Sequence, residues 1–173
     1  YSGVDKPANV IDVPLVQNNN SGWQSELFLQ NTSRAPAYAA ITFTGRSGSQ
    51  CTHFVDNIPP NGRRKLVISQ LGCTVDTILS AYINAAQPLA VAATQYDNGQ
   101  YRFMETEHLA GDSTTLYAPL LQNNNSGWVS GLSLMNTSGG NATAWTSYYT
   151  AGGQLCTDPS YSLYPWQPKP IYP

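Results

Sequence analysis

QNNNSGW occupies residues 17–23, and the same seven residues return at 122–128. The two copies belong to a longer repeat, because shifting the sequence by 105 residues places Val13–Thr52 on Ala118–Thr157 without a gap. Twenty of those 40 positions are identical, and over residues 14–33 the count is 15 of 20. Such self-similarity at a fixed period indicates a chain built from copies of one structural module.

The period divides the chain into one whole module and part of another. We expect a first module over residues 1–112 and a partial second copy over residues 113–173. The second copy lacks counterparts of the β-rich segments Thr77–Ala85 and Leu89–Tyr96. Half of a two-layer β structure exposes its inner face and an unpaired strand edge, which natural proteins avoid. Either further sequence completes the second module, or another chain supplies the missing strands.

Short alternating segments separated by turn signals predict an all-β fold. Leu27 and Leu29 face one side of Trp23–Asn31 while Glu26 and Gln30 face the other, which is the period of a half-buried strand. The sequence therefore predicts antiparallel, immunoglobulin-like β-sandwich modules in tandem, the second incomplete, with no helix longer than one turn. Further strands are expected at residues 37–44, 65–69, 77–85, 89–96 and 101–105, with an Asn-Gly hairpin turn at residues 97–99.

The three cysteines are Cys51, Cys73 and Cys156. In a secreted protein an odd number indicates that one cysteine pairs outside this sequence or stays unpaired. Cys156 is the counterpart of Cys51, whereas the counterpart of Cys73 falls beyond residue 173. We therefore expect a Cys51–Cys73 disulfide and a Cys156 that is unpaired or pairs with another chain. Closing that loop contributes roughly 3 kcal/mol in the chain-entropy model. Three buried free thiols are the alternative.

The residues that repeat also resemble a known bacterial repeat. The pattern runs from Val13 to Trp23 and continues with Leu27, Leu29 and the pair Asn31-Thr32. It resembles immunoglobulin-like repeats of about 100 residues, strung in tandem through large secreted or surface proteins of filamentous bacteria. The resemblance implies a β-sandwich, an extracellular or cell-surface location, and a place in an array or assembly. It implies little about activity, and the cysteine pair departs from the typical repeat.

The composition points to a similar environment. Charged residues make up 10% of the chain against roughly 25% in an average soluble protein, which is typical of a secreted or cell-surface protein. The net charge is −2 and the longest basic run is Arg63-Arg64-Lys65, so no nucleic-acid partner is expected. No apolar run approaches the roughly 20 residues that span a bilayer, so no membrane insertion is expected either.

Catalysis needs titratable groups brought together, and the sequence offers few. His53 aligns with Asp158, so no role that needs imidazole is shared by both copies. His108 follows Glu105 and Glu107 near the module junction, where a solvated linker is a simpler interpretation than a metal or proton-transfer site. The sequence has no CxxC motif, calcium loop or phosphate-binding glycine loop. We therefore expect no enzymatic activity, no cofactor and no metal.

Two kinds of function remain open. In the first, the modules are building blocks of a filament, sheath or surface layer, and bind copies of themselves or neighbouring modules of the same polypeptide, with the second copy completed by strand addition. In the second, the chain is a carbohydrate-binding or adhesive module of a larger secreted protein. The candidate glycan-stacking residues are Trp145, Tyr149, Tyr164 and Trp166. Core filling and packing between modules are the competing interpretation of these aromatic residues.

The heptad itself predicts a structural corner rather than a ligand site. Asn tolerates left-handed backbone and can close a turn with its own side chain, and glycine adds freedom just before the indole. The corner residues are Asn18, Asn19, Asn20, Gly22 and Trp23 in the first copy and Asn123, Asn124, Asn125, Gly127 and Trp128 in the second. An array of identical corners could also form contacts between modules.

Five asparagines stand in the Asn-x-Ser/Thr sequence that marks N-glycosylation in secreted eukaryotic chains. They are Asn19, Asn31, Asn124, Asn136 and Asn141. In a bacterial chain the match is weaker, because Asn-rich turns produce it by chance.

Overall fold

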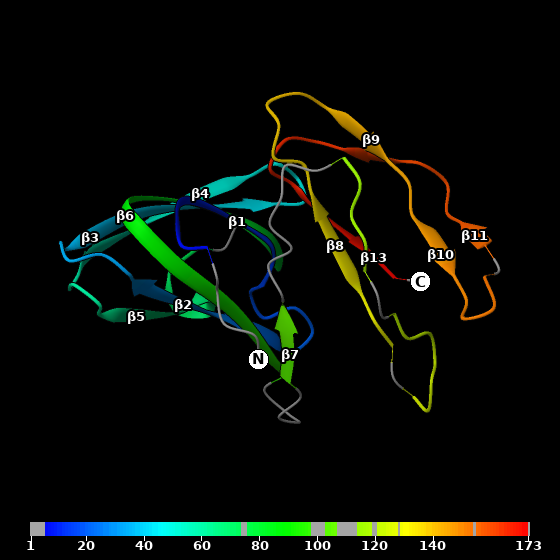
Figure 1. Ribbon diagram of the computed structural model, residues 1–173, viewed down its shortest axis with the longest axis horizontal. Helices are drawn as coiled ribbons and strands as arrows, with labels where there is room; N and C mark the ends of the chain where they lie inside the picture. The colour runs from blue at the N-terminus through cyan, green and yellow to red at the C-terminus, as the bar shows by residue number, and fades with distance from the viewer. Residues whose placement is uncertain are drawn as a thin grey trace.

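The computed structural model of the chain describes residues 6–73, 76–97, 103–106, 114–118, 121–127, 129–153 and 155–172 (Figure 1). These residues form antiparallel strands and one three-residue 3-10 helix, η1 (Ile68–Gln70), and they contain no α-helix. The predicted all-β, antiparallel fold is confirmed. In this part of the chain no helix is long and apolar enough to cross a membrane.

The first unit, residues 8–106, is a strongly curled sheet of seven strands organised around one long strand. The strands are β1 (Ala8–Gln17), β2 (Trp23–Asn31), β3 (Ala37–Gly45), β4 (Gln50–Ile58), β5 (Arg63–Val67), β6 (Ile78–Asp97) and β7 (Phe103–Thr106). The first half of β6 pairs with β1 and β3, and its second half pairs with β2 and β7. The sheet therefore folds over itself into two layers that share β6, with the core between them.

β6 is one continuous strand of 20 residues, so the prediction of two separate strands is wrong at this point. Its partners change across Ala86–Pro88, because Ala85 pairs with β3 and Leu89 pairs with β2. Proline has no N–H to donate, and strands tolerate it at bends and bulges. The Pro88 carbonyl instead accepts the backbone N–H of Thr32 at 3.2 Å and its hydroxyl at 3.0 Å. The proline thus marks the bend between layers rather than the end of a strand.

The core follows the alternation that the sequence predicts. Leu27 and Leu29 of β2 are 0% and 1% exposed. Ile83 of β6 and Phe43 of β3 are also fully buried. The apolar residues on the inner sides of the two layers form a single buried cluster, which is what close-packed β layers require.

The second unit, residues 114–172, contains six short strands. They are β8 (Leu132–Met135), β9 (Ala142–Ala144), β10 (Ser147–Tyr149), β11 (Leu155–Thr157), β12 (Tyr161–Leu163) and β13 (Pro168–Ile171). β8 pairs with β13, β9 with β12, and β10 with β11. These are the counterparts of the pairs β2–β5 and β3–β4 in the first unit.

The 105-residue period also holds for the pairing of strands. Leu27 lies opposite Leu66, and Leu132 lies opposite Ile171. Phe43 lies opposite Cys51, and their counterparts at positions 148 and 156 are again partners. A pairing register sets which side chains share a face, so the copies agree in structure beyond their identical residues.

The two units differ in the strands that pair with β6 in the first unit. β3 has nine residues and is paired on both sides, whereas its counterparts β9 and β10 have three residues each. β1 pairs with β6, and the described parts of its counterpart, 114–118 and 121–122, contain no strand. The division at residues 112 and 113 stays a prediction, because residues 107–113 and the His108 candidate lie outside the described residues.

Candidate functional site

The repeated corner of the first unit is held by hydrogen bonds to the segment that leads into β6. Asn18 donates its backbone N–H to the Thr77 carbonyl at 2.8 Å and its side-chain amide to the Cys73 carbonyl at 2.7 Å. The Asn20 amide donates to Gln17 Oε1 at 2.8 Å. These asparagines therefore satisfy polar groups of the protein itself.

Backbone conformation accounts for the other corner residues. Asn19 has a φ of 55° and Gly22 a φ of 92°, both in the left-handed region. A Cβ at Gly22 would also lie 3.0 Å from Asp97 Oδ1. Both the backbone conformation and this close approach therefore favour glycine at this position. Trp23 is half-buried and exchanges two 3.0 Å backbone hydrogen bonds with Asn20.

The second copy of the corner has the same shape with fewer partners. Asn124 and Gly127 have φ values of 54° and 83°. Gln122 donates its backbone N–H to Ser130 Oγ at 2.9 Å, as Gln17 does to Ser25 Oγ at 2.8 Å. The side chains of Asn123, Asn124 and Asn125 are exposed, and Trp128 lies outside the described residues. A role of this corner as a contact between modules stays a prediction.

Cys51 and Cys73 form a disulfide across 22 residues, so the alternative of three free thiols is wrong. The bond ties β4 to the segment that precedes β6. Cys156 is free and exposed. It occupies the position of Cys51 in the repeated register, opposite Tyr148 as Cys51 is opposite Phe43.

Two strand edges of the second unit have no partner strand among the described residues. In the first unit β6 pairs with one edge of β2 and one edge of β3. Within the described part of the second unit, β8 pairs with β13 alone, and β9 and β10 pair with β12 and β11 alone. We call these two edges and the apolar surface between them the open face. Leu132 and Leu134 on β8 are half-buried, unlike their fully buried counterparts in β2.

The outer side of the second unit packs against the first. The Trp166 ring meets the Tyr82 ring edge-on, with centroids 5.0 Å apart and planes at 62°. The Ser80 hydroxyl donates to the Trp166 carbonyl, and the Ser133 hydroxyl donates to the Pro14 carbonyl at 2.8 Å. Ser80 and Tyr82 alternate with core residues of β6 and so point outward. On β8 the contact uses Ser133, which alternates with Leu132 and Leu134, and β10 and β11 lie far from the first unit (Figure 1).

Trp166 has an unusual backbone conformation for its size. Its φ is 62°, and its counterpart in the first unit is Asn61 with a φ of 54°. Left-handed backbone suits asparagine but costs a bulky residue about 1–2 kcal/mol. The contact with Tyr82 offsets this strain, so packing between units accounts for Trp166 better than glycan stacking does.

The four predicted glycan-stacking residues do not form one platform. Trp145 and Tyr149 are 67% and 70% exposed at the β9–β10 segment. Tyr164 is 50% exposed and lines a groove between the units. Trp166 is in the contact with Tyr82. Of the four, Trp145 and Tyr149 are the most exposed, and both lie in the β9–β10 segment.

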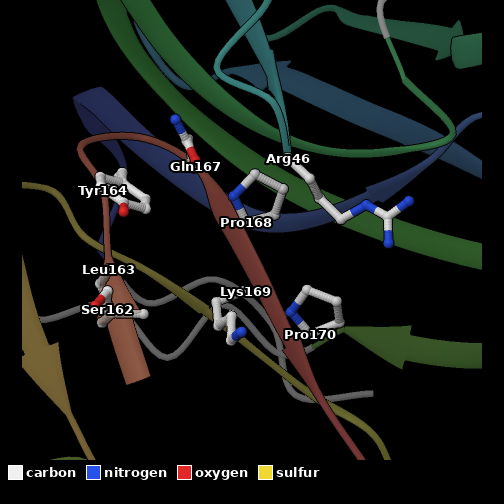
Figure 2. Close-up of a pocket in the computed structure, with 8 residues that line it drawn as sticks. All are labelled: Arg46, Ser162, Leu163, Tyr164, Gln167, Pro168, Lys169 and Pro170. Carbon is white, nitrogen blue, oxygen red and sulfur yellow. The ribbon is translucent and has the colours of Figure 1, made fainter. Parts of the chain in front are cut away.

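The groove between the units has a volume of about 340 Å³ (Figure 2). It is lined by Arg46, Ser162, Leu163, Tyr164, Gln167, Pro168, Lys169 and Pro170. Arg46 extends from the β3–β4 turn beside the groove, and its Nε lies 3.7 Å from Asp76 Oδ2. Lys169 lies 5.4 Å from the centre of the Tyr161 ring. The lining contains no carboxylate or imidazole that could act with these cations in acid–base chemistry.

A polar cluster on the second unit was missed from the sequence. The hydroxyls of Tyr148 and Tyr161 both donate to Asp158 Oδ2, at 2.7 Å and 2.5 Å. Burial and the Asp158 carboxylate raise the pKa of Tyr148 to about 12. The hydrogen bonds from Tyr161 and Tyr148 lower the pKa of Asp158. The replacement of Phe43 and His53 by Tyr148 and Asp158 at neighbouring strand positions was the available signal.

Because of this cluster, we expect Tyr148 to lose its proton at a higher pH than an ordinary tyrosine. Difference titration of tyrosinate absorbance between the wild type and Tyr148→Phe should show Tyr148 still protonated at about pH 11, where an ordinary tyrosine is mostly ionised. Because its folded pKa exceeds the unfolded value of 10.0, its stabilising contribution is complete below pH 10 and disappears as the pH rises to about 12. The contribution of Asp158, whose pKa is lowered, is instead lost as the pH falls below the ordinary carboxyl range. Asp158→Asn should move the Tyr148 midpoint downward, and an unchanged midpoint would contradict the assignment.

Two of the five asparagines in Asn-x-Ser/Thr sequences, Asn31 and Asn136, have buried side-chain amides. Asn31 is 0% exposed and its Nδ2 donates to the carbonyls of Ala35, Ile58 and Pro59 at 2.7, 3.0 and 3.1 Å. Asn136 is 7% exposed and repeats two of these bonds, at 2.7 and 3.2 Å. Both nitrogens are occupied in the interior, which argues against a sugar there. Asn19, Asn124 and Asn141 are exposed, and their glycosylation stays a prediction.

Asn31→Ala should lower the free energy of unfolding by about 2–3 kcal/mol, because it leaves buried carbonyl groups without donors. Urea denaturation of the first unit measures the change. Thr32→Ala is the matched control, since Thr32 is exposed and its hydroxyl makes one hydrogen bond. Equal effects of the two substitutions would contradict the role of Asn31.

In the part of the chain that the structure describes, no three His, Cys, Asp or Glu side chains lie close enough together to hold a metal ion. His53 lies on β4, paired with Ile41. The absence of enzymatic activity and of a cofactor stays a prediction.

Comparison with known proteins bears on the fold. No protein-family model and no curated protein matches the chain. A solved structure, described as "Crystal Structure of Thermotoga maritima 1070", is similar with a TM-score of 0.50 and 22% identity, over 58% of this chain and 92% of that one. That share of 173 residues is about 100 residues, close to one repeat period. At this identity the likeness shows the fold alone.

Proposed function

We propose that the chain is a non-enzymatic structural repeat, a building block of an extracellular or cell-surface assembly such as a filament or sheath. One observation carries the proposal: the second unit repeats the strand register and corner of the first, but within the described residues the two edges that β6 fills in the first unit have no partner. Exposed edges of this kind pair with other strands. The strand-pairing surfaces occur in both copies of the repeat, whereas the cluster around Asp158 occurs in the second copy alone.

An extracellular location is supported by the Cys51–Cys73 disulfide, since structural disulfides persist in oxidising environments. The low content of charged residues also supports it. The resemblance to tandem immunoglobulin-like repeats of surface proteins agrees with both.

The packing between the units offers one way for repeats to join. Trp166, Ser133 and their partners Tyr82 and Pro14 form a contact, and none of these four residues is charged. Contacts of this kind are little weakened by salt, because screening acts on charges. Assembly should therefore persist at high ionic strength.

Electron microscopy of the native material and sedimentation velocity of the purified chain test the proposal. We expect regular polymers in the native material and concentration-dependent oligomers of the purified chain, both little changed between about 0.1 and 1 M salt. Dispersed monomers in the native material and at every concentration of the purified chain would contradict the proposal.

The exposure of Trp145 and Tyr149 favours a second candidate, a carbohydrate-binding or adhesive module. Aromatic faces with this exposure can stack on sugar rings. A glycan array tests this candidate, with the Trp145→Ala and Tyr149→Ala variants as the comparison and Tyr38→Ala, an exposed tyrosine on the first unit, as the control. An array without hits would exclude it.

A further inference from the structure

We infer that the groove between the two units binds an acidic saccharide, whose sugar rings carry carboxylates. The groove brings Arg46 of the first unit together with Lys169 of the second, and Tyr164 lines it with a half-exposed ring (Figure 2). The inference rests on the carbohydrate-binding candidate and deepens it, because it names a ligand class and a site away from Trp145 and Tyr149.

The charge of the groove favours an anion. Arg46 and Lys169 are both positive, and the other residues that line the groove are uncharged. Asp76 faces only one part of the guanidinium, since its Oδ2 lies 3.7 Å from Arg46 Nε. The Arg46 side chain is 52% exposed, and the N–H groups on its Nη atoms suit a carboxylate of a ligand.

The turn that carries Arg46 is fixed by Asp76. The Oδ2 atom of Asp76 accepts the backbone N–H of Arg46 at 3.0 Å, and its Oδ1 accepts that of Thr77 at 2.6 Å. These bonds tie the β3–β4 turn to the segment that leads into β6. The position of the guanidinium at the groove is therefore set by the fold of the first unit.

Lys169 is held by the cluster around Asp158. Its Nζ lies 5.4 Å from the centre of the Tyr161 ring, which is a cation–π contact. The Tyr161 hydroxyl in turn donates to Asp158 Oδ2 at 2.5 Å. A cation that is oriented beforehand loses less side-chain freedom when an anion binds. The cluster thereby gains a role, which is to position the ammonium group at the groove.

The uncharged lining residues suit the body of a sugar. Tyr164 is 50% exposed, so its ring is accessible for stacking on a sugar ring. Gln167 and Ser162 add an amide and a hydroxyl that can exchange hydrogen bonds with sugar hydroxyls. The volume of about 340 Å³ lies at the lower end of the roughly 300–1,000 Å³ of small-ligand sites, which suits a short saccharide.

A peptide fits the groove less well than a saccharide does. Residues 167–170 all line it, so the groove runs along β13 and is not confined to one face of that strand. Pro168 and Pro170 have no N–H, and β13 therefore lacks donors that an added peptide strand would need. Recognition at this groove has to come from side chains, as it does for sugars.

Isothermal titration calorimetry of the full chain with a galacturonic acid disaccharide tests the inference. We expect one disaccharide to bind per chain, with an affinity that falls between about 0.05 and 0.5 M salt, because the attraction is between charges. Maltose is the matched neutral ligand and should not bind. No binding of the acidic disaccharide, or equal binding of maltose, would overturn the inference.

Substitutions identify the site of binding. Arg46→Gln and Lys169→Gln should each lower the affinity by about tenfold, because each removes a charge-assisted hydrogen bond to a carboxylate. Arg34→Gln is the matched control, since Arg34 is an exposed arginine outside the groove lining, and it should leave the affinity unchanged. An affinity that is unchanged in both groove variants would place the binding elsewhere and overturn the assignment.

The proposed functions fail separately from this inference. If glycans on the array bind and are lost in Trp145→Ala or Tyr149→Ala but not in Arg46→Gln, the carbohydrate-binding candidate stands and the groove is wrong. The structural repeat is tested by polymers that resist salt, whereas binding at the groove is weakened by salt. Loss of either property therefore leaves the other measurable.

Discussion

Leu29→Ala should lower the free energy of unfolding of the first unit by about 3 kcal/mol, whereas its counterpart Leu134→Ala should lower that of the second unit by less than about 1 kcal/mol. Leu29 is 1% exposed between two complete layers, so the substitution leaves a cavity. Leu134 is half-buried beside the open face, where the surroundings can relax and water already reaches. The same residue at the same position of the repeat thus has two different environments.

Native-state hydrogen exchange measures both changes, because it reports the opening free energy of each unit separately. The control is the pair Gln30→Ala and Met135→Ala, which alters outward-facing neighbours of the two leucines. Equal effects of Leu29→Ala and Leu134→Ala would contradict an open second unit.

Ile83→Asp should prevent the first unit from folding. Ile83 is 0% exposed in the first half of β6, where it pairs with both β1 and β3, and an unpaired buried carboxylate costs more than the roughly 5–15 kcal/mol by which a typical domain is stable. Since β6 pairs with four other strands, losing it should release both layers together.

Circular dichroism and NMR dispersion of the purified variant measure the loss. Asn84→Asp is the matched control, because it places the same charge on the next residue of β6, whose side chain is exposed. A folded Ile83→Asp variant would contradict the central place of β6.

The repeat and the alternation of residues were enough to predict much of the fold. Both are local signals: Leu27 and Leu29 identify a buried face, and the alignment of Cys51 with Cys156 identifies the cysteine left over. The disulfide prediction followed from that alignment and is confirmed.

What the sequence did not show depends on contacts between distant residues. Pro88 is read locally as a strand breaker, yet it lies at the bend where β6 changes layers. Asn31 matches a glycosylation sequence, but carbonyls 27 and 28 residues away bury its amide. The sequence left Trp166 open between glycan stacking and packing between modules, because its partner Tyr82 is far away in the sequence. Each of these features depends on a partner that no local pattern identifies.

Hydrogen exchange of the isolated chain and of the native assembly, compared at β8 and β10, tests the central claim most directly. The account predicts that amides of Leu132–Met135 and Ser147–Tyr149 on the open edges exchange rapidly in the isolated chain and become protected in the assembly, as those of Trp23–Asn31 already are in the first unit. Full protection of both segments in the isolated chain, or rapid exchange in both states, would contradict a second unit that is completed by a partner strand.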